Sequence, residues 1–247
     1  MSNIHVLRTE VSRTVSALRG SINDKGVVRT AERVAAVAAA QVLAPLIRTR
    51  RQNNRFEFRG ERLPYTLARY NNSFLNERAV EVSIAHWFLS KNTGRVLEVG
   101  NVLRHYGVTG QTVLDKYEVI PGVLNYDVVD FVPESPFDTV VAISTLEHVG
   151  WDETPRQPDN VFRAMDNVKK FGGTDGRVLV TVPIGHNKVL DAGLRAGKVS
   201  FPQETWLART NRRNDWAEVE PEEALSRTYG EPYTGANAIY VGMVLSD

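Results

Sequence analysis

The stretch Gly94–Gly107, GRVLEVGNVLRHYG, decides the fold. Its first part, Arg95–Val99, is a short apolar run of strand-forming residues, and Gly100 ends it. Residues 101–106 are expected to begin a helix. A buried parallel strand, a sharp glycine turn and a helix together form the opening unit of a nucleotide-type α/β fold.

Glu98 lies inside this apolar run, one residue before its last apolar position. A carboxylate is costly to bury unless something uses it. At the carboxyl end of a strand it either accepts hydrogen bonds from loop N–H groups or holds a cationic or hydroxylated ligand. The sequence leaves both interpretations open.

Composition sets the outer bounds of the chain. It has 247 residues, of which 42% are hydrophobic and 24% charged, which indicates a globular α/β domain with an appendage. Because there is no cysteine, a disulfide framework and a thiolate zinc site are excluded. No apolar run approaches a membrane span, and the first residues lack the order of a signal peptide. A cytoplasmic protein without a membrane partner is therefore expected.

Charge is unevenly spread along the chain. Residues 1–62 carry 12 Lys and Arg against 5 Asp and Glu, although the net charge of the whole is +1. A basic segment can contact nucleic acid or an anionic surface. The interpretation favoured here is a solvated helix face against an acidic body, since no aromatic residues interleave with the basic ones as in a nucleic-acid-binding patch.

The segment 1–62 is predicted to be a helical extension ahead of a main domain at 63–247. Apolar spacing indicates helices over residues 4–20 and Val27–Ile47, and the alternation in Phe56–Leu63 around Gly60 indicates a small hairpin. The helices are too small to form a core of their own, so they are expected to act as a lid or as the contact of a homo-oligomer.

Residues 65–89 predict a helix with an inward apolar face, preceded by polar and aromatic residues that include Tyr65 and Tyr70. That cluster is either an ordinary capped helix entry or a ligand-facing segment over the glycine turn. From Gly94 strands alternate with helices, which implies a parallel, doubly wound sheet. The predicted strands are Arg95–Val99, Thr112–Lys116, Val123–Phe131, Asp138–Ser144, Arg177–Val182 and Ala238–Leu245, with a helix over Pro158–Phe171.

From Arg95 to Val244 the chain resembles a class I S-adenosylmethionine-dependent methyltransferase. VLEVG at 96–100 resembles the first motif of the family, TVLDKYE at 112–118 the second strand and NYDVVDF at 125–131 the third. FDTVVAISTLEHVG at 137–150 resembles the fourth strand and its exit, and GRVLVTVPIG at 176–185 the fifth. The resemblance implies a Rossmann-like sheet of seven strands whose last strand, Ala238–Leu245, is antiparallel.

One position departs from the family pattern. The family usually continues Glu/Asp-x-Gly-x-Gly, whereas Asn101 and Val102 follow Gly100 here. Glycine matters where backbone approaches a ligand closely, so Val102 narrows that approach. A nicotinamide fold matches less well, because GNVLRHYG lacks the G-x-G-x-x-G spacing that cradles a pyrophosphate.

The resemblance implies S-adenosylmethionine as the cofactor, held at the ends of successive strands. Asp115 follows Glu98 by 17 residues, near the spacing at which a carboxylate meets a ribose diol. Asp130 or Asp127 is expected to accept from the adenine amino group. The remaining cofactor residues are expected to be Gly100 in the turn, Phe131 against the adenine ring and Ser144 beneath the sulfonium.

His148 is the expected catalytic base, because it follows the fourth strand at the carboxyl edge of the sheet and titrates near neutrality. The alternative is a structural hydrogen bond to the following helix. Glu147 is expected to orient His148, or to hold a divalent ion with Asp152 or Glu153. No metal site is predicted, since EHVGWDE does not match the spacing of a known metal cage.

The acceptor is expected to be a small molecule or an oligosaccharide bound by Trp151, His186 and Asn187 together with Tyr65 and Tyr70. The Asn-Pro-Pro-Tyr tetrad of many N-methylating relatives is absent and STLEH stands in its place, which favours an oxygen acceptor. The chain is similar to sugar O-methyltransferases that act on mycobacterial methylmannose polysaccharide precursors. Two alternatives remain: a catalytically silent methyltransferase-like binding protein, and a nucleic-acid-modifying methyltransferase.

Overall fold

The structure is a computed structural model that describes residues 42–91 and 94–245. The chain divides into two compact units, residues 1–49 and 50–247. Residues 42–51 are helical. The predicted helix over 4–20, most of the helix over Val27–Ile47 and their role as a lid or oligomer contact lie outside the described residues. The fold set out below is that of the second unit.

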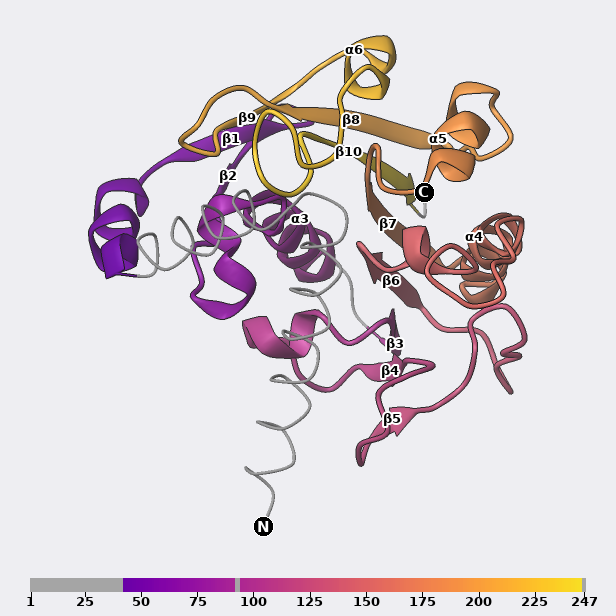
Figure 1. Cartoon of the computed structure of the whole chain (residues 1–247). Coiled ribbons are helices and arrows are strands. Elements are labelled where there is room, and N and C mark those ends of the chain that lie inside the picture. Colours follow the sequence, from indigo (N-terminus) through magenta and orange to yellow (C-terminus); the bar gives the residue numbers. More distant parts are fainter. Residues whose placement is uncertain (1–41, 92–93, 246–247) are drawn as a thin grey trace. The chain divides into compact units, whose positions relative to one another are not determined.

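A central sheet organises this unit (Figure 1), and eight strands belong to it among the described residues. Neighbouring strands pair in parallel from β5 to β7, and β10 is antiparallel to the strands on both its sides. Across the sheet the strands are β5 (Val123–Leu124), β4 (Thr112–Leu114), β3 (Val96–Val99), β6 (Thr139–Ile143), β7 (Arg177–Pro183), β10 (Ala238–Val244), β8 (Gln203–Arg209) and β9 (Trp216–Glu218). This order confirms the predicted Rossmann-like α/β sheet and its antiparallel last strand, with one strand more than the seven predicted.

The sheet is covered on both faces, because its central strands are mostly apolar and almost entirely buried. All five residues of β6 are buried. Val140 and Ala142 pack into one core with α4 (Asn160–Phe171) and α5 (Lys188–Arg195). Val141 and Ile143 pack into the other core with α3 (Arg78–Ser90), so α3 and α4 lie on opposite faces of the sheet (Figure 1).

The predicted hairpin is present as β1 (Arg55–Phe58) and β2 (Glu61–Pro64), which pair antiparallel. Arg59 and Gly60 both have positive φ, 53° and 77°, as the two-residue turn of such a hairpin requires. Phe56 and Phe58 are buried against the core on the α3 side of the sheet. The hairpin therefore belongs to the same compact unit as the sheet.

Three expectations from the sequence need correction. The predicted third strand is short, because only β5 pairs and residues 125–131 form turns instead. The segment after Gly100 forms a single 3-10 turn, η2 (Leu103–Tyr106), rather than a full helix. Sequence patterns missed β8, β9 and α5, and they also missed η1 (Tyr70–Leu75), η3 (Leu146–His148) and α6 (Pro221–Leu225).

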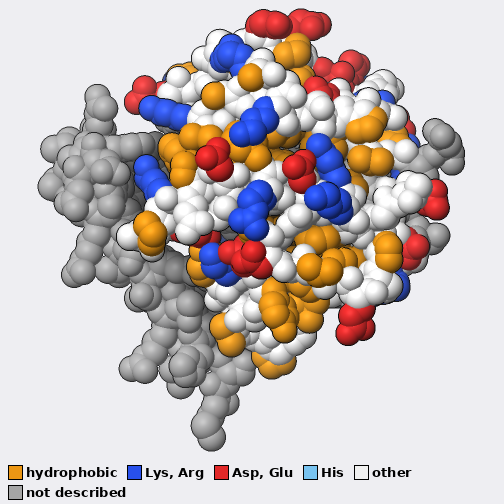
Figure 2. Space-filling model, turned by 90° about the vertical axis from the view of Figure 1, so that its right-hand side faces the viewer, with side chains coloured by type: hydrophobic (Ala, Val, Ile, Leu, Met, Phe, Trp, Pro, Cys, Tyr) orange, Lys and Arg blue, Asp and Glu red, His pale blue; other side chains and the backbone are white. Residues whose placement is uncertain are grey.

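The surface of the described residues mixes charge with apolar patches. On the face seen in Figure 2, acidic and basic side chains are interspersed between patches of hydrophobic atoms. Exposed apolar side chains include Tyr117, Val119, Tyr126 and Val132, in the segment around β5. Among the described helices, none combines the length and the apolar character needed to cross a membrane.

Candidate functional site

The glycine turn follows β3 at the carboxyl edge of the sheet and lies against Thr145, which follows β6. Gly100 has φ of 85°, a value that favours glycine, and a Cβ placed there would overlap the side chain of Thr145. Its N–H donates to the carbonyl of Leu114 in β4 at 2.8 Å. The turn is therefore fixed between two strand ends, and it lies directly against the segment that leads to His148.

Glu98 shapes this turn from inside the protein. It is fully buried, and one carboxylate oxygen accepts from the N–H groups of Val102 and Leu103 at 2.7 and 2.6 Å. Its other oxygen accepts from Gln111 at 2.9 Å. Burial raises the pKa of Glu98, and these hydrogen bonds partly offset the rise. Of the two roles open from the sequence, the structure supports binding to loop N–H groups.

Val102 does not need to be glycine for backbone reasons. Its φ and ψ are −98° and −51°, which any residue adopts, and its side chain packs against the core on the α3 side. The missing second glycine of the family motif therefore leaves the turn unstrained.

The acids after β4 make several local contacts. Asp115 accepts from the N–H groups of Tyr117 and Glu118 through one oxygen, at 2.8 Å each. Glu118 in turn accepts from the side-chain amide of Asn101 at 2.9 Å, which ties the end of β4 to the glycine turn. The buried Oδ1 of Asn101 has no hydrogen-bond partner within the described part of the chain.

Asp127 and Asp130 stand in different surroundings. Asp127 pairs with Lys116 at 2.7 Å, and Lys116 also reaches Glu153 at 2.8 Å. Asp130 is three-quarters exposed and lies 3.5 Å from Arg163 on the surface. The contact of Asp130 with the adenine amino group stays a prediction. Phe131 packs edge-on against Phe171 at 5.4 Å, in the core beside α4.

A buried ionic network links the start of α3 to the end of β6. Arg78 lies 3.2 Å from Glu81 and donates to the carbonyls of Ile143 and Ser144 at 3.0 and 3.3 Å. Glu81, fully buried, also accepts from the hydroxyls of Ser144 and Thr181 at 2.6 and 2.9 Å. Burial raises the pKa of Glu81, and the charge of Arg78 opposes that rise.

Ser144 is held by this network rather than left open for a ligand. Its hydroxyl is used by Glu81, its N–H donates to the carbonyl of Thr181 at 2.9 Å, and its φ is 40°. A non-glycine residue at positive φ persists only where its surroundings hold it. Ser144 thus redirects the chain out of β6 toward His148, and its contact with the cofactor stays a prediction.

His148 and Asp152 form a hydrogen-bonded pair on one turn after β6. The backbone N–H of Asp152 donates to the carbonyl of His148 at 3.1 Å, so the two side chains lie on the same side. Nδ1 of His148 is 2.5 Å from Oδ2 of Asp152. Both side chains are about half exposed. Burial lowers the pKa of His148, but the hydrogen bond to Asp152 and the charge of Glu147 outweigh it and leave the pKa raised.

Glu147 lies beneath this pair and is 1% exposed. Its Oε1 is 3.5 Å from Nε2 of His148, and its Oε2 has no hydrogen-bond partner among the described residues. Burial raises the pKa of Glu147 to about 7, against the opposing charge of His148. The sequence analysis expected Glu147 to orient His148. In the structure Asp152 holds the Nδ1 side of the ring, and Glu147 approaches Nε2.

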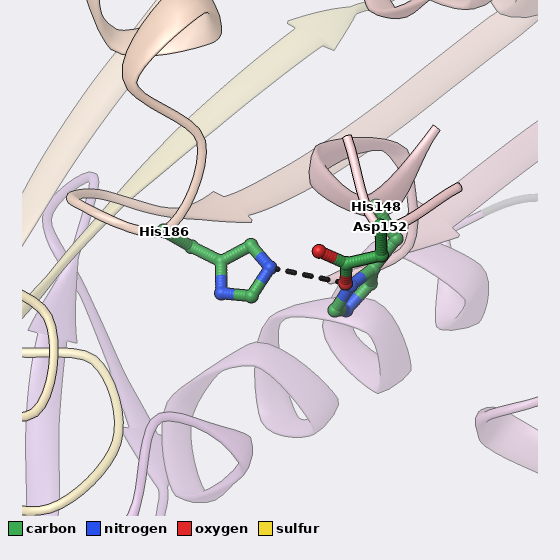
Figure 3. Close-up of side chains that lie close together, drawn as sticks. All are labelled: His148, Asp152 and His186. Atoms are coloured by element: carbon green, nitrogen blue, oxygen red, sulfur yellow. Dashed lines mark hydrogen bonds and ion pairs between the residues drawn. The ribbon is translucent and has the colours of Figure 1, made fainter. Parts of the chain in front are cut away.

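His186 enters the same site from the loop after β7. Its Nε2 is 3.4 Å from Oδ2 of Asp152, and its ring lies 4.7 Å from that of His148 and 5.2 Å from that of Tyr229. Figure 3 shows the two imidazoles approaching Asp152 from separate segments. Burial lowers the pKa of His186, and the neighbouring His148 lowers it further.

Asn187 has a structural role beside His186. It is fully buried and caps α5 by accepting from the N–H groups of Val189 and Leu190 at 3.0 and 3.1 Å. Its amide also donates to the carbonyl of Glu147 at 2.9 Å. Asn187 thus fixes the loop of His186 to the segment of Glu147, and its role in binding an acceptor stays a prediction.

The three predicted aromatic acceptor residues are dispersed. Tyr65 lies under Arg51 and accepts from the backbone N–H of Trp216 at 3.0 Å, which makes it part of the packing near β9. Tyr70 stacks on His105 at 4.1 Å, on the segments before α3 and after the glycine turn. Trp151 follows His148 by three residues, and the centre of its ring lies 4.7 Å from Cζ of Arg156.

Sequence reasoning missed Arg78, Glu81 and Tyr229 as parts of the site. A usable signal existed for Glu81, since it interrupts the apolar run Ala79–Ile84 of a buried helix. Charge inside such a run indicates a buried partner. Tyr229 carried no comparable signal, because it approaches His186 only through the path of the loop before β10.

The comparisons with known proteins find similarity among solved structures alone. No family model matches the chain, and neither does any curated protein. Among solved structures, it is similar to a methyltransferase from Thermotoga maritima described as a possible histamine N-methyltransferase. The two sequences are 12% identical over 68% of this chain and 88% of that one, and the TM-score is 0.42.

Two further structures show similar levels of likeness. The N-methyltransferase NodS from Bradyrhizobium japonicum, in complex with S-adenosylhomocysteine, has 12% identity over 68% of this chain and 85% of its own, with a TM-score of 0.41. A 1,6-didemethyltoxoflavin N1-methyltransferase from Burkholderia thailandensis has 16% identity over 67% and 77%, with a TM-score of 0.38. Similarity at this level does not carry a substrate or a residue's role over to this chain.

Proposed function

We propose that this chain is an S-adenosylmethionine-dependent O-methyltransferase that acts on a sugar hydroxyl, with a mannoside precursor of methylmannose polysaccharide as its first candidate acceptor. The observation that carries the proposal is the His148–Asp152 pair, with 2.5 Å between Nδ1 and Oδ2, at the carboxyl edge of the sheet. In open α/β sheets ligands bind at this edge. Thr145, three residues before His148, is the residue against which the turn at Gly100 packs.

Three polar side chains near the glycine turn support an adenosylmethionine site. Asn101 has a buried side-chain oxygen without a protein partner in the described chain. Asp115 and Glu118 supply carboxylates at the end of the neighbouring strand, suited to a ribose diol. When bound, adenosylmethionine supplies an electrophilic methyl group on a sulfonium.

His148 is the group that takes the proton from the acceptor. A sugar hydroxyl is a very weak acid, so its oxygen needs a base as it takes the methyl group. The hydrogen bond from Nδ1 to Asp152 leaves the lone pair on Nε2, and the proton moves from the hydroxyl to that atom. Asp152 then stabilises the imidazolium that forms.

The charges of the site favour an uncharged acceptor. Glu81, Glu147 and Asp152 bring negative charge to this edge, and Arg78 is engaged by Glu81 and two backbone carbonyls. An anionic acceptor such as a sugar phosphate would meet repulsion here. Of these carboxylates, Asp152 is about half exposed and can accept a hydrogen bond from a hydroxyl group of a neutral polyol.

The test is methyl transfer by the full-length chain. We expect adenosylhomocysteine to bind in calorimetry and to accumulate when adenosylmethionine is incubated with mannosides. His148→Gln should cut turnover by about 10²–10⁴-fold and leave adenosylhomocysteine affinity within a few-fold. The matched control His86→Ala, on the exposed side of α3, should retain turnover.

Three results would contradict the proposal in different ways. Binding of adenosylhomocysteine without turnover on any hydroxyl acceptor would indicate a silent binding protein. Transfer to oligonucleotides in place of sugars would indicate the nucleic-acid-modifying alternative. Full turnover by His148→Gln would exclude His148 as the base.

A further inference from the structure

Two imidazoles and a carboxylate converge at the carboxyl edge of the sheet (Figure 3). Nδ1 of His148, Oδ2 of Asp152 and Nε2 of His186 all lie within 4.8 Å of one another. We propose that these three atoms bind one divalent transition-metal ion. This inference goes beyond methyl transfer and does not depend on it.

The donor set selects the class of metal. Imidazole nitrogen suits Zn²⁺ and neighbouring transition metals, whereas Mg²⁺ and Ca²⁺ prefer oxygen ligands. Three protein ligands leave at least one position open for water or for a hydroxyl group, as in catalytic zinc sites. The site is therefore assigned to Zn²⁺ or a metal of similar preference.

The three ligand atoms are already close to the spacing that a metal needs. Bonds of about 2.0–2.2 Å to a tetrahedral ion place neighbouring ligands roughly 3–3.5 Å apart. Asp152 is 3.4 Å from His186, and its 2.5 Å hydrogen bond to His148 opens when an ion replaces the shared proton. Since the His148 and Asp152 side chains are about half exposed, small rotations are sufficient.

Two separate elements hold the ligands in place. His148 and Asp152 are four residues apart on one turn, closed by the backbone hydrogen bond between them. The loop of His186 is fixed on one side by Asn187, which caps α5 and holds the carbonyl of Glu147. On the other side Asp191 accepts from the N–H of Gly185 at 3.0 Å.

Glu147 provides an independent sign of a metal centre. Metal-binding histidines usually donate their second ring N–H to a carboxylate, which fixes the tautomer and the ring. With Nδ1 of His148 on the metal, Nε2 carries the proton and faces Oε1 of Glu147 at 3.5 Å. The carboxyl of Glu147 is 1% exposed, and its Oε2 finds no partner among the described residues.

Metal binding and proton acceptance use the same imidazole in exclusive ways. A metal on Nδ1 displaces the hydrogen bond to Asp152 and leaves the proton on Nε2, the atom that acts as the base in the proposed methyl transfer. A bound ion therefore suppresses transfer that relies on His148 as the base.

The site is tested by metal binding to the full-length chain, first stripped with a chelator. Titration with Zn²⁺ in a calorimeter should give one ion per chain, and Co²⁺ should show absorption bands of a site with nitrogen and oxygen ligands. His186→Ala and Asp152→Asn should each weaken Zn²⁺ binding about 100-fold or more. Glu147→Gln should weaken it by about 10–100-fold as an orienting group.

The control is His86→Ala, which removes an exposed histidine of α3 and should leave Zn²⁺ affinity unchanged. Circular dichroism and thermal melting establish that each variant is folded, and the exposed Asp152 serves if His186→Ala does not fold. Wild-type affinity in Asp152→Asn, or an equal loss in His86→Ala, would overturn the site and indicate adventitious binding. Because methyl transfer is not the readout, failure here leaves the proposed function standing.

Discussion

Glu98 and Glu147 are the same residue type, both buried near the carboxyl edge of the sheet, yet the protein uses them differently. Glu98 lies inside β3 and Glu147 in the turn η3 after β6, and they are 0% and 1% exposed. Both oxygens of Glu98 are hydrogen-bonded, to two backbone N–H groups and to Gln111. Glu147 has one oxygen near His148 and another without a partner in the described chain.

This difference separates acids with a structural role from acids that are available for chemistry at this edge of the sheet. The two side chains are equally buried, so burial does not distinguish their roles. Their hydrogen-bond partners do. An acid whose hydrogen bonds are all satisfied by the fold stabilises a turn. An acid left partly unsatisfied beside an imidazole is available to a proton, a metal or a ligand.

The sharpest test of the chemical side is Asp152→Asn. The amide cannot hold the Nδ1 proton of His148 as the carboxylate does, and it does not stabilise an imidazolium. Under the proposed function, turnover should fall by about 10²–10⁴-fold while adenosylhomocysteine affinity stays within a few-fold. Steady-state kinetics and calorimetry measure the two quantities. An unchanged rate would place Asp152 outside the reaction.

A pair of alanine variants tests the comparison between Glu98 and Glu147 directly. Glu98→Ala and Glu147→Ala remove the same atoms from equally buried places, so the cavity effects largely cancel. Glu98→Ala also leaves the N–H groups of Val102 and Leu103 unsatisfied, at about 1–3 kcal/mol each. The free energy of unfolding in urea should therefore fall by about 2–6 kcal/mol more for Glu98→Ala. Equal losses would mean that Glu147 is bonded as completely as Glu98.

Asp115 and Asp130 extend the test to the cofactor residues. Asp115→Asn keeps an oxygen for the turn at Tyr117 but loses charge toward a ribose diol, so adenosylhomocysteine affinity should fall about tenfold or more. Asp130→Asn is the matched control, since Asp130 is exposed beside Arg163. Calorimetry should show an unchanged affinity for the control. A loss of adenosylhomocysteine affinity in both variants would indicate that Asp130 also belongs to the binding site.

Asp191 gives the smallest effect and a pH signature. Burial raises its pKa to about 6, so the folded protein holds this proton more tightly than the unfolded chain. Its stabilising contribution is complete below the unfolded pKa near 4 and is lost as pH rises through about 6. A rise in pKa from about 4 to about 6 corresponds to roughly 2–3 kcal/mol, which solvent screening reduces at this partly exposed carboxyl. Relative to Asp191→Asn, the wild type should therefore lose about 1 kcal/mol of unfolding free energy between pH 4 and 7. A difference independent of pH would mean that the carboxyl titrates normally.

Much of the fold could be predicted because its signals are local. Apolar runs that end in Gly100 or in Ser144 are visible in any reading of the chain, and the hairpin turn at Gly60 needs only its own residues. β8 was missed because it pairs with β10, which comes much later in the chain, and β9 was missed because it has only three residues. The candidate site followed the same rule: His148 was found from its place after a strand.

The sequence alone determined the order of strands and helices, the two-sided burial of the sheet and the position of His148 at its carboxyl edge. Only the tertiary structure decided what each polar residue does there. Glu98 binds the backbone of the glycine turn, Ser144 donates to Glu81, and Asn187 caps a helix. Folding also brings His186 to Asp152 across 34 residues. The physical reason is that apolar periodicity is a property of neighbours along the chain, whereas a hydrogen bond belongs to whichever group folding places within about 3 Å.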